Sequence, residues 1–420
     1  MSNTVEQEII VGLDIGTTKV CVVVAAIDEN GGYNILGIEK SPSEGLTRGV
    51  VTNIDKTVRS IQGAVAEAEA RSGIQVQSVV VGIAGDHIQS FQSRGVVAIA
   101  GQEKEINQAD VNRLIEDTKK VALPSDRRII HVIPQEFIID GQDGVNDPVG
   151  MSGVRLEANV HIITGLVTAA QNIVKCVQRT GLHIRDMVLE PLASSYAVLD
   201  EQEKEVGVAL LDIGGGTTDL AVFEDRTIRH TAVIPIAGSQ VTNDIRKGCL
   251  VLTEQAERLK CQHGFAYAPS VVDDEPITIP GIGGRPPLEI DKRLLARIIQ
   301  PRMEEIFEIA SMEIKRSGYS RHLGAGVVLT GGGSLIKGIS ELAQEVLGLP
   351  VKIGIPSGFK SGLVREIENP MYSTCVGLVL YALQNKDTNA LLTNNNGKSA
   401  FSMSKAVKKM KSWFQAVDEM

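Results

Sequence analysis

Two segments of the chain place a carboxylate, a glycine turn and threonine hydroxyls in nearly the same order. Leu-Asp-Ile-Gly-Thr-Thr begins at Leu13, and Leu-Asp-Ile-Gly-Gly-Gly-Thr-Thr begins at Leu211. Each segment lies between runs of β-branched and aliphatic residues, a pattern that indicates strand, tight turn and strand. The second turn carries two additional glycines. A repeat with a period near half the chain predicts two related domains with a cleft between them; chance similarity of two such units is the alternative.

Turns of this kind can bind phosphate. Glycine lets the backbone approach a ligand closely, successive N–H groups form an anion site, and threonine hydroxyls add donors. An aspartate at the preceding strand end can hold Mg²⁺ through water, since Mg²⁺ prefers one or two carboxylates together with phosphates. Two facing hairpins would clamp the phosphates from both sides. The predicted phosphate ligands are Gly16, Thr17, Thr18, Lys19, Gly214, Gly215, Gly216, Thr217 and Thr218, and the predicted metal-site carboxylates are Asp14 and Asp212.

A third glycine-rich segment, Thr-Gly-Gly-Gly-Ser at 330–334, follows an aliphatic run and precedes a helical pattern. Its glycines Gly331, Gly332 and Gly333 would let a flat base or sugar lie against the backbone. Alone, a glycine turn between a strand and a helix is a weak signal. The order of the three segments along the chain is a strong signal, and it favours a nucleotide site.

The composition narrows the class of protein. The 420 residues predict two to four domains, and the formal charge of −9 disfavours nucleic acid as the main partner. Five scattered cysteines without a CxxC pair favour a reducing cytosol over disulfides or a zinc site. The N-terminus has no signal-peptide pattern, and the longest apolar run, 20–27, is too short to span a bilayer. We therefore expect a cytoplasmic protein unless something attaches it to a membrane.

Periodicity predicts the elements around the motifs. Helices are expected at 110–121, 172–180, 240–263, 292–317 and 336–347, and strands at 128–139 and 156–165. The stretch 269–287 is rich in proline, glycine and acidic residues, which indicates loops and short strands. Residues 385–402 are polar and rich in asparagine, which favours a flexible linker.

The segment 403–420 forms an amphipathic helix on a helical wheel. Its apolar face holds Val407, Met410, Trp413, Phe414 and Val417, and its basic face holds Lys405, Lys408, Lys409 and Lys411. This pattern after a linker is typical of a helix that lies in a membrane interface; a helix packed on its own globular body is the alternative. Residues 398–420 carry five lysines and two acids, so they are net +3 and the rest of the chain is −12. Anionic lipid would attract the tail and not the body.

The order and spacing of the three glycine segments resemble the actin-like ATPase superfamily. The hairpin segments are similar to its two phosphate motifs, 330–334 to its adenosine motif, and 190–196 and 373–383 to its connecting helices. The resemblance implies an α/β fold of duplicated ribonuclease-H-like domains that binds ATP and Mg²⁺ and is at most a weak ATPase. The implied nucleotide contacts are Gly238, Glu257 and Lys260, and the implied catalytic residues, which would position water or Mg²⁺, are Asp212 and Glu190. Glu257 and Lys260 share a helix face, although a surface ion pair is the alternative.

Within the superfamily, 128–136, 146–153 and 283–287 resemble the FtsA family of bacterial cell-division proteins, and the resemblance covers essentially the whole chain. It implies an inserted, SHS2-like subdomain 1C and no actin-like subdomain 1B. The implied subdomains are 1A at 1–84 and 165–205, 1C at 85–164, 2A at 206–240, 2B at 241–320, and 2A with a return to 1A at 321–384. A flexible linker, 385–402, and an amphipathic membrane-targeting helix, 403–420, follow.

The FtsA resemblance implies a peripheral protein at the division site, on the cytoplasmic side of the inner membrane. It would bind ATP, polymerise through 1C, anchor FtsZ filaments and help to recruit other division proteins. The FtsZ C-terminal peptide would dock on 2B, where Arg285, Arg297 and Arg302 are candidates, although solvated surface charge is equally common. The alternatives are a small-molecule kinase of the superfamily and a PilM-like pilus-assembly adaptor. A kinase needs a base beside its acceptor hydroxyl, for which no motif is evident, and neither alternative explains the tail.

Overall fold

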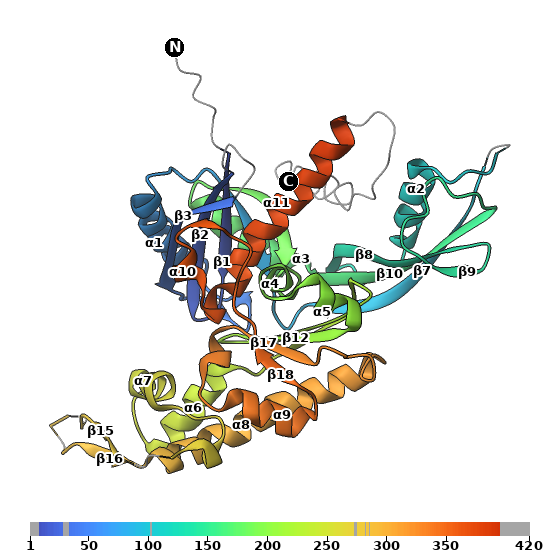
Figure 1. Cartoon of the computed structure of the whole chain (residues 1–420). Helices are drawn as coiled ribbons and strands as arrows, with labels where there is room; N and C mark the ends of the chain where they lie inside the picture. Colours follow the sequence, from blue (N-terminus) through green and yellow to red (C-terminus); the bar gives the residue numbers. More distant parts are fainter. Residues whose placement is uncertain are drawn as a thin grey trace.

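Two sheets of the same topology form the two halves of the protein, seen in a computed structural model (Figure 1). The structure describes residues 8–27, 33–100, 103–272, 275–281, 283–284 and 286–394. The strands of the first sheet, in spatial order, are β11 (His183–Leu189), β6 (Ser78–Ile83), β1 (Ile9–Ile15), β2 (Lys19–Ile27), β3 (Tyr33–Pro42) and β19 (Ser361–Gly362). Those of the second are β18 (Val351–Ile353), β17 (Val327–Thr330), β12 (Val208–Ile213), β13 (Thr218–Glu224) and β14 (Thr227–Ile234).

The strand directions show that the second sheet repeats the first. In each, an antiparallel hairpin is extended by a third antiparallel strand on one side (β1, β2, β3 and β12, β13, β14). On the other side, two parallel strands follow (β6, β11 and β17, β18). The central strands β1, β2, β12 and β13 are buried along almost their whole length, as their near-continuous apolar sequences require. The predicted duplication is therefore confirmed.

Helices cover both sheets. Those packed with the first half are α1 (Ile54–Ser72), α3 (Val167–Arg179), α4 (Glu190–Val198), α10 (Val364–Ile367) and α11 (Ser373–Asn394), while the short α5 (Glu201–Val206) contacts β13 of the second sheet. Those of the second half are α6 (Gly238–Cys249), α7 (Thr253–His263), α8 (Lys292–Arg316) and α9 (Ile339–Leu347). The small hairpins are β4 (Leu46–Thr47) with β5 (Val50–Val51), and β15 (Ile277–Ile279) with β16 (Leu288–Ile290). Short 3₁₀ turns are η1 (Ala268–Ser270), η2 (Gly332–Leu335) and η3 (Pro370–Tyr372).

A third unit is inserted between β6 and α3, and it projects to the right in Figure 1. Its elements are β7 (Gln89–Ala98), α2 (Gln108–Thr118), β8 (Arg127–Ile139), β9 (Gln142–Val145) and β10 (Arg155–Leu166). They form a four-stranded antiparallel sheet, β7-β10-β8-β9, with a hydrophobic core of its own. The unit also reaches the second half, because Gln135 donates to the carbonyls of Ile228 and Arg229 at 2.8 and 3.0 Å. The edge strand β14 is thus covered by the insertion.

Four expected elements differ from the structure. The helix expected at 172–180 begins earlier, at Val167. The helix expected at 240–263 is two helices, α6 and α7, because Leu250 adopts a left-handed conformation (φ 54°) and ends α6. The helix expected at 336–347 begins only at Ile339, after Gly338 at φ 74°. Helix α11 continues to Asn394, so the first part of the expected linker 385–402 is helical; extending a helix whose N-terminal half is buried is easy. The rest of the linker and the segment 403–420 lie outside the described residues. None of the described helices is both long and apolar enough to cross a bilayer.

Candidate functional site

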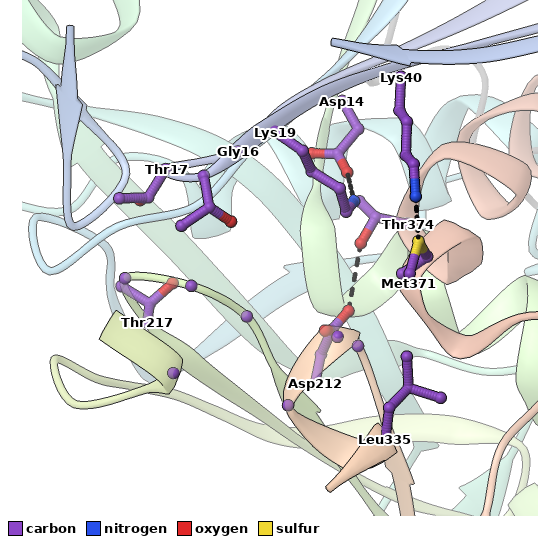
Figure 2. A pocket seen from close by; sticks show the side chains of 18 of the residues that line it. Asp14, Gly16, Thr17, Lys19, Lys40, Asp212, Thr217, Leu335, Met371 and Thr374 are labelled. Atoms are coloured by element: carbon purple, nitrogen blue, oxygen red, sulfur yellow. Dashed lines mark hydrogen bonds and ion pairs between the residues drawn. The ribbon is translucent and has the colours of Figure 1, made fainter. Parts of the chain in front are cut away.

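The two hairpins meet tip to tip beside a cavity that both of them line (Figure 2). A Cβ atom at Gly215 would lie 2.4 Å from Cγ2 of Thr18, and one at Gly216 would lie 2.4 Å from Oγ1 of Thr17. Such distances are far below van der Waals contact, so the second hairpin needs glycine at its tip to make room for the threonines of the first. The left-handed backbone is not the reason, since neither glycine has a positive φ.

The two turns have the same length. Gly16 N–H donates to Lys19 O at 2.9 Å, and Gly214 N–H donates to Thr217 O at 3.0 Å, so each turn closes around two residues. The additional glycines of the second motif are therefore not an insertion. Gly215 and Gly216 are at the positions that the two threonines occupy in the first hairpin. The strand registers pair Asp14 with Cys21 in the first hairpin and Asp212 with Asp219 in the second, so Asp219 is equivalent to Cys21.

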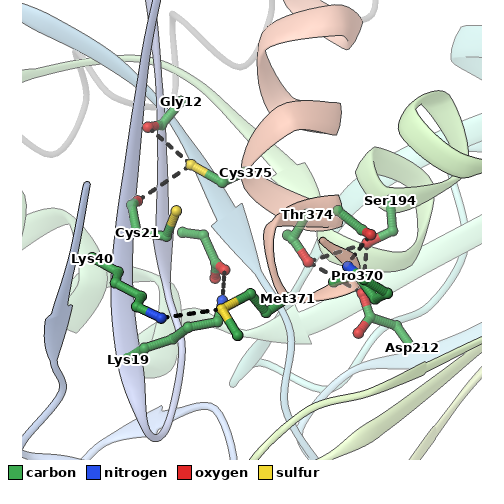
Figure 3. Close-up of polar contacts among 12 residues, drawn as sticks. Gly12, Lys19, Cys21, Lys40, Ser194, Asp212, Pro370, Met371, Thr374 and Cys375 are labelled. Carbon is green, nitrogen blue, oxygen red and sulfur yellow. Dashed lines mark hydrogen bonds and ion pairs between the residues drawn. The ribbon is translucent and has the colours of Figure 1, made fainter. Parts of the chain in front are cut away.

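The aspartates one residue before the ends of β1 and β12 are buried and have different partners. Oδ2 of Asp14 forms an ion pair with Nζ of Lys19 at 3.2 Å. Oδ2 of Asp212 accepts hydrogen bonds from Oγ of Ser194 at 2.6 Å and Oγ1 of Thr374 at 3.1 Å (Figure 3). Ser194 is on α4 and Thr374 is on α11, so hydroxyls from both predicted connecting helices hold this carboxylate.

These two helices cross in close contact. A Cβ atom at Gly377 of α11 would lie 1.9 Å from the carbonyl oxygen of Ala193 on α4. Helix crossings this tight require glycine, because any side chain would push the helices apart. The crossing lies between the two halves. It fixes the positions of the Ser194 and Thr374 hydroxyls, which donate to Asp212.

Four carboxylates crowd this part of the cavity, and in the described part of the chain only Asp14 among them forms an ion pair with a lysine. Burial, together with Asp14, Asp219 and Asp212, raises the pKa of Glu190 well above its usual range. Burial also raises the pKa of Asp212, and burial and Asp212 raise the pKa of Asp219 to about 8. Among the described residues, Oδ1 of Asp219 is buried without a hydrogen-bond partner. This group of carboxylates lacks enough positive charge to balance it, and one of its oxygens lacks a hydrogen-bond partner. A divalent cation and its waters would supply both.

Lysine 19 supplies the cation on the first hairpin. Burial lowers its pKa, but the charge of Asp14 and the hydrogen bond to it outweigh burial, so the pKa of Lys19 is raised and the ammonium stays charged. Its side chain lines the cavity next to the turn (Figure 2). A charged ammonium beside a turn of N–H and hydroxyl donors is suited to phosphate.

The cavity has a volume of about 620 Å³ and is lined from both halves. The predicted ligands that line it are Asp14, Gly16, Thr17, Thr18, Lys19, Glu190, Asp212, Gly214, Gly215, Gly216, Thr217, Gly238, Glu257, Lys260, Gly331, Gly332 and Gly333. A volume of this size lies in the range of small-molecule and cofactor sites. The one predicted nucleotide ligand that is not among the lining residues is Thr218, whose buried hydroxyl donates to Ile236 O at 2.8 Å.

Another wall of the cavity is formed by α7 and the third glycine turn. Nζ of Lys260 lies 2.7 Å from Oε2 of Glu257 and 3.1 Å from the carbonyl oxygen of Gly238. Gly331 has φ 79°, and a Cβ atom there would lie 2.3 Å from Oδ1 of Asp212, whereas one at Gly332 would meet nothing within 4 Å. Gly332 therefore presents bare backbone to open space, as a flat base or sugar requires.

Several lining residues were not predicted as site residues. They include Lys40, Met371, Thr374, Leu335 and Asp219. A correct strand register for the predicted hairpin places Asp219 opposite Asp212 and would have identified it as a site residue. Aligning the two Thr-Thr pairs of the motifs gives a different register. Leu335 directly follows the third glycine segment, and Thr374 lies in the segment 373–383 that resembles a connecting helix. Lys40 and Met371 come from distant segments, and no local signal marks them.

The three candidate arginines of the 241–320 region differ in their surroundings. Nε of Arg302 lies 2.7 Å from Oδ2 of Asp244, and its guanidinium also contacts Glu305. Arg297 is exposed on α8, and Arg285 lies outside the described residues. Arg302 is thus already paired within the protein, and Arg297 faces solvent.

Two copies of one sheet topology, with phosphate-type hairpins meeting beside a cavity, define an actin-like protein. Solved structures share this fold. The PilM–PilN type IV pilus biogenesis complex matches with a TM-score of 0.65 at 15% identity, over 89% of this chain and 98% of the other. MreB 5 of Spiroplasma citri bound to AMPPNP matches with a TM-score of 0.55 at 15% identity, over 92% and 98%.

Sequence comparisons identify the family. Residues 209–377 match the family model "Cell division protein FtsA", and residues 85–164 match "SHS2 domain inserted in FTSA". The cell division protein FtsA of Pseudomonas aeruginosa is 46% identical over 99% of both chains, and that of Escherichia coli K12 is 40% identical over 91% of this chain and 92% of the other. The chain belongs to the FtsA family of cell-division proteins, and the inserted unit is its SHS2 domain.

Proposed function

We propose that this protein binds ATP in the cavity that the two hairpins line and, as a polymer on the cytoplasmic face of the inner membrane, anchors FtsZ filaments at the division site. The observation that carries ATP binding is the tip-to-tip pairing of the hairpins over buried carboxylates. Membership of the FtsA family supports the cell-division role. The proposal also includes recruitment of further division proteins through the inserted domain.

The residues of the cavity fit ATP with Mg²⁺. Turn N–H groups and threonine hydroxyls of both hairpins would bind the phosphates, together with Lys19, while the third glycine turn and the pair Glu257–Lys260 would hold the adenosine. Asp14, Asp212 and Asp219 would hold Mg²⁺ mostly through water, and the bound cation would neutralise phosphate charge. MreB 5, which shares the fold, has been solved with AMPPNP and with ADP.

Hydrolysis is a lesser part of the proposal. Asp212 is held by two hydroxyls and the half-buried Glu190 lies near it, so either carboxylate could orient a water molecule. We propose that ATP serves mainly to close the cleft and permit assembly, and that hydrolysis is weak. An Asp212→Ala variant that releases phosphate at the same basal rate as the wild type would show that hydrolysis by this carboxylate has no role.

The membrane attachment rests on residues 403–420, which lie outside the described residues. Their basic and apolar faces would bind anionic lipid weakly in a single copy, and assembly would strengthen the attachment through multivalency. Deleting 403–420 should leave ATP binding intact and abolish sedimentation with anionic liposomes. Unchanged liposome binding after the deletion would refute the attachment.

The FtsZ peptide would dock beside α8, where apolar and basic side chains are exposed together. Leu250 at the end of α6 is 84% exposed, Leu294 is 49% exposed, and Arg297 follows one turn later on α8. The two helices pack together, since a Cβ atom at Gly248 would lie 2.8 Å from Ile298. An acidic peptide with apolar side chains fits this surface, with Arg285 and Arg302 as further candidate contacts.

A binding titration tests the docking proposal. The FtsZ C-terminal peptide should bind saturably, and Arg297→Glu should weaken it more than Arg302→Glu, because Arg302 is already paired with Asp244. Arg316→Glu, on the same helix but near its other end, is the control for a general charge effect. Absence of peptide binding to the wild type at high concentration would refute the docking proposal.

A further inference from the structure

Lys40 is a second lysine on the cavity-facing side of the first sheet. It lies on β3 directly opposite Cys21 of β2, and Lys19 precedes Cys21 by two residues. Side chains two residues apart in a strand share a face, and so do directly paired residues of neighbouring strands. Lys19 and Lys40 therefore extend from the same face, and both line the cavity (Figures 2 and 3).

The two ammonium groups have different partners. Nζ of Lys19 is paired with the carboxylate of Asp14. Nζ of Lys40 lies 3.4 Å from the thioether sulfur of Met371 and 5.9 Å from the ring centroid of Tyr372. A thioether is a weak, uncharged acceptor, and an exposed cation–π contact contributes little. Lys40 is exposed at the wall of the cavity, and both of these partners of its side chain are uncharged.

We propose that Lys40 binds the polyphosphate of the nucleotide, and that its side chain leaves the thioether of Met371 to do so. The inference rests on the proposed binding of ATP and adds a ligand that none of the three glycine motifs contains. An anionic phosphate oxygen is a much stronger partner for an ammonium than a thioether sulfur. The long, flexible side chain of lysine allows it to move from one to the other.

The proposal predicts an effect that depends on ligand charge. Lys40→Met should weaken ATP and ADP by about tenfold, as expected for loss of a hydrogen bond to a charged group, and should leave adenosine affinity unchanged. Lys40→Arg, which keeps the charge, should bind ATP within about twofold of the wild type. Lys360→Met is the matched control, because Lys360 is exposed and is not among the cavity-lining residues.

Calorimetric titrations of the full chain with ATP, ADP and adenosine, with melting curves of each ligand-free variant, test the proposal. Loss of ATP and ADP affinity with unchanged adenosine affinity and melting temperature would support it. Wild-type affinity of Lys40→Met for ATP would overturn it and leave the proposed function intact. Equal weakening of all three ligands would overturn it too, since it would show a structural role. Failure of the wild type to bind ATP would overturn both proposals.

Discussion

The two hairpins at the cavity have the same backbone and carry different side chains. The first hairpin has Thr17 and Thr18 at its tip, where the second has Gly215 and Gly216. The tips meet, and the threonines of one occupy the space that the glycines of the other leave free. The two copies of the hairpin thus have the same backbone structure, whereas the residues at their tips are complementary in shape.

The hairpins also differ in charge. The first offsets Asp14 with Lys19, whereas the second sets Asp212 opposite Asp219 with no lysine between them. The first hairpin therefore supplies a cation for phosphate, and the second supplies unbalanced carboxylates that would attract a metal ion. Neither hairpin alone has both parts of a site for a nucleotide with Mg²⁺.

Breaking the shape complementarity should have the largest effect. Gly216→Thr would place its Cβ 2.4 Å from Oγ1 of Thr17 and 3.1 Å from Cα of Arg48, so the tips could not meet. Calorimetry should show ATP affinity lowered by about a hundredfold, which corresponds to overpacking by about 2–3 kcal/mol.

The exchanged pair provides the control for this prediction. Thr17→Gly combined with Gly216→Thr moves the side chain from one tip to the other and should recover part of the lost affinity. Recovery would be incomplete because Arg48 still contacts position 216. Wild-type ATP affinity in the single Gly216→Thr variant would contradict the account of the tips.

Removing one carboxylate of the second hairpin should change how stability depends on pH. The pKa of Asp219 is raised to about 8 in the folded protein, so the folded state holds a proton that the unfolded state loses above about pH 4. The free energy of unfolding of the metal-free wild type should therefore fall as the pH rises from 5 to 8. Over the same pH range, the free energy of unfolding of the Asp219→Asn variant should fall by about 2 kcal/mol less than that of the wild type.

Urea denaturation in EDTA at pH 5 and pH 8 measures this difference. Asp143→Asn, which removes an exposed carboxylate on β9 outside the cavity, is the control and should behave like the wild type. A pH dependence of Asp219→Asn that matched the wild type would show that Asp219 is not held protonated by its surroundings.

The sequence predicted the repeat and the glycine turns but not the equivalence of their residues. Matching Thr-Thr to Thr-Thr suggested two inserted glycines, whereas the hydrogen-bonded register aligns Thr17 and Thr18 with Gly215 and Gly216. The two sequence segments can be aligned in more than one way, and only the pairing of the strands shows which residues lie opposite each other in each hairpin. This is why Asp219 was missed as a site residue.

Residues that reach the site from distant segments could not be predicted. Lys40 and Met371 meet only because β3 and η3 are brought together by the fold, and Thr374 holds Asp212 from the start of α11. In contrast, the inserted domain at 85–164 was predicted from its resemblance to the FtsA family and is confirmed. Its contact with β14 depends on tertiary placement, for which the sequence has no periodic signal.

The smallest expected effect concerns the hydroxyl at the first tip. The N–H of Gly49, in the turn between β4 and β5, donates to Oγ1 of Thr17 at 3.3 Å. Thr17→Val keeps the volume, removes this acceptor, and should lower the free energy of unfolding by about 1 kcal/mol. Thr18→Val is the control, and equal destabilisation by the two substitutions would show that the bond to Gly49 is not the cause.

The central claim is that the two hairpins close together on ATP and a divalent cation. Titration calorimetry of the full chain with ATP, in Mg²⁺ and then in EDTA, tests it most directly. The account predicts one saturable site per chain whose affinity falls at least about tenfold in EDTA, since the carboxylates of the second hairpin would then face the phosphates without a cation. Absence of saturable binding in Mg²⁺, or equal affinity in EDTA, would contradict it.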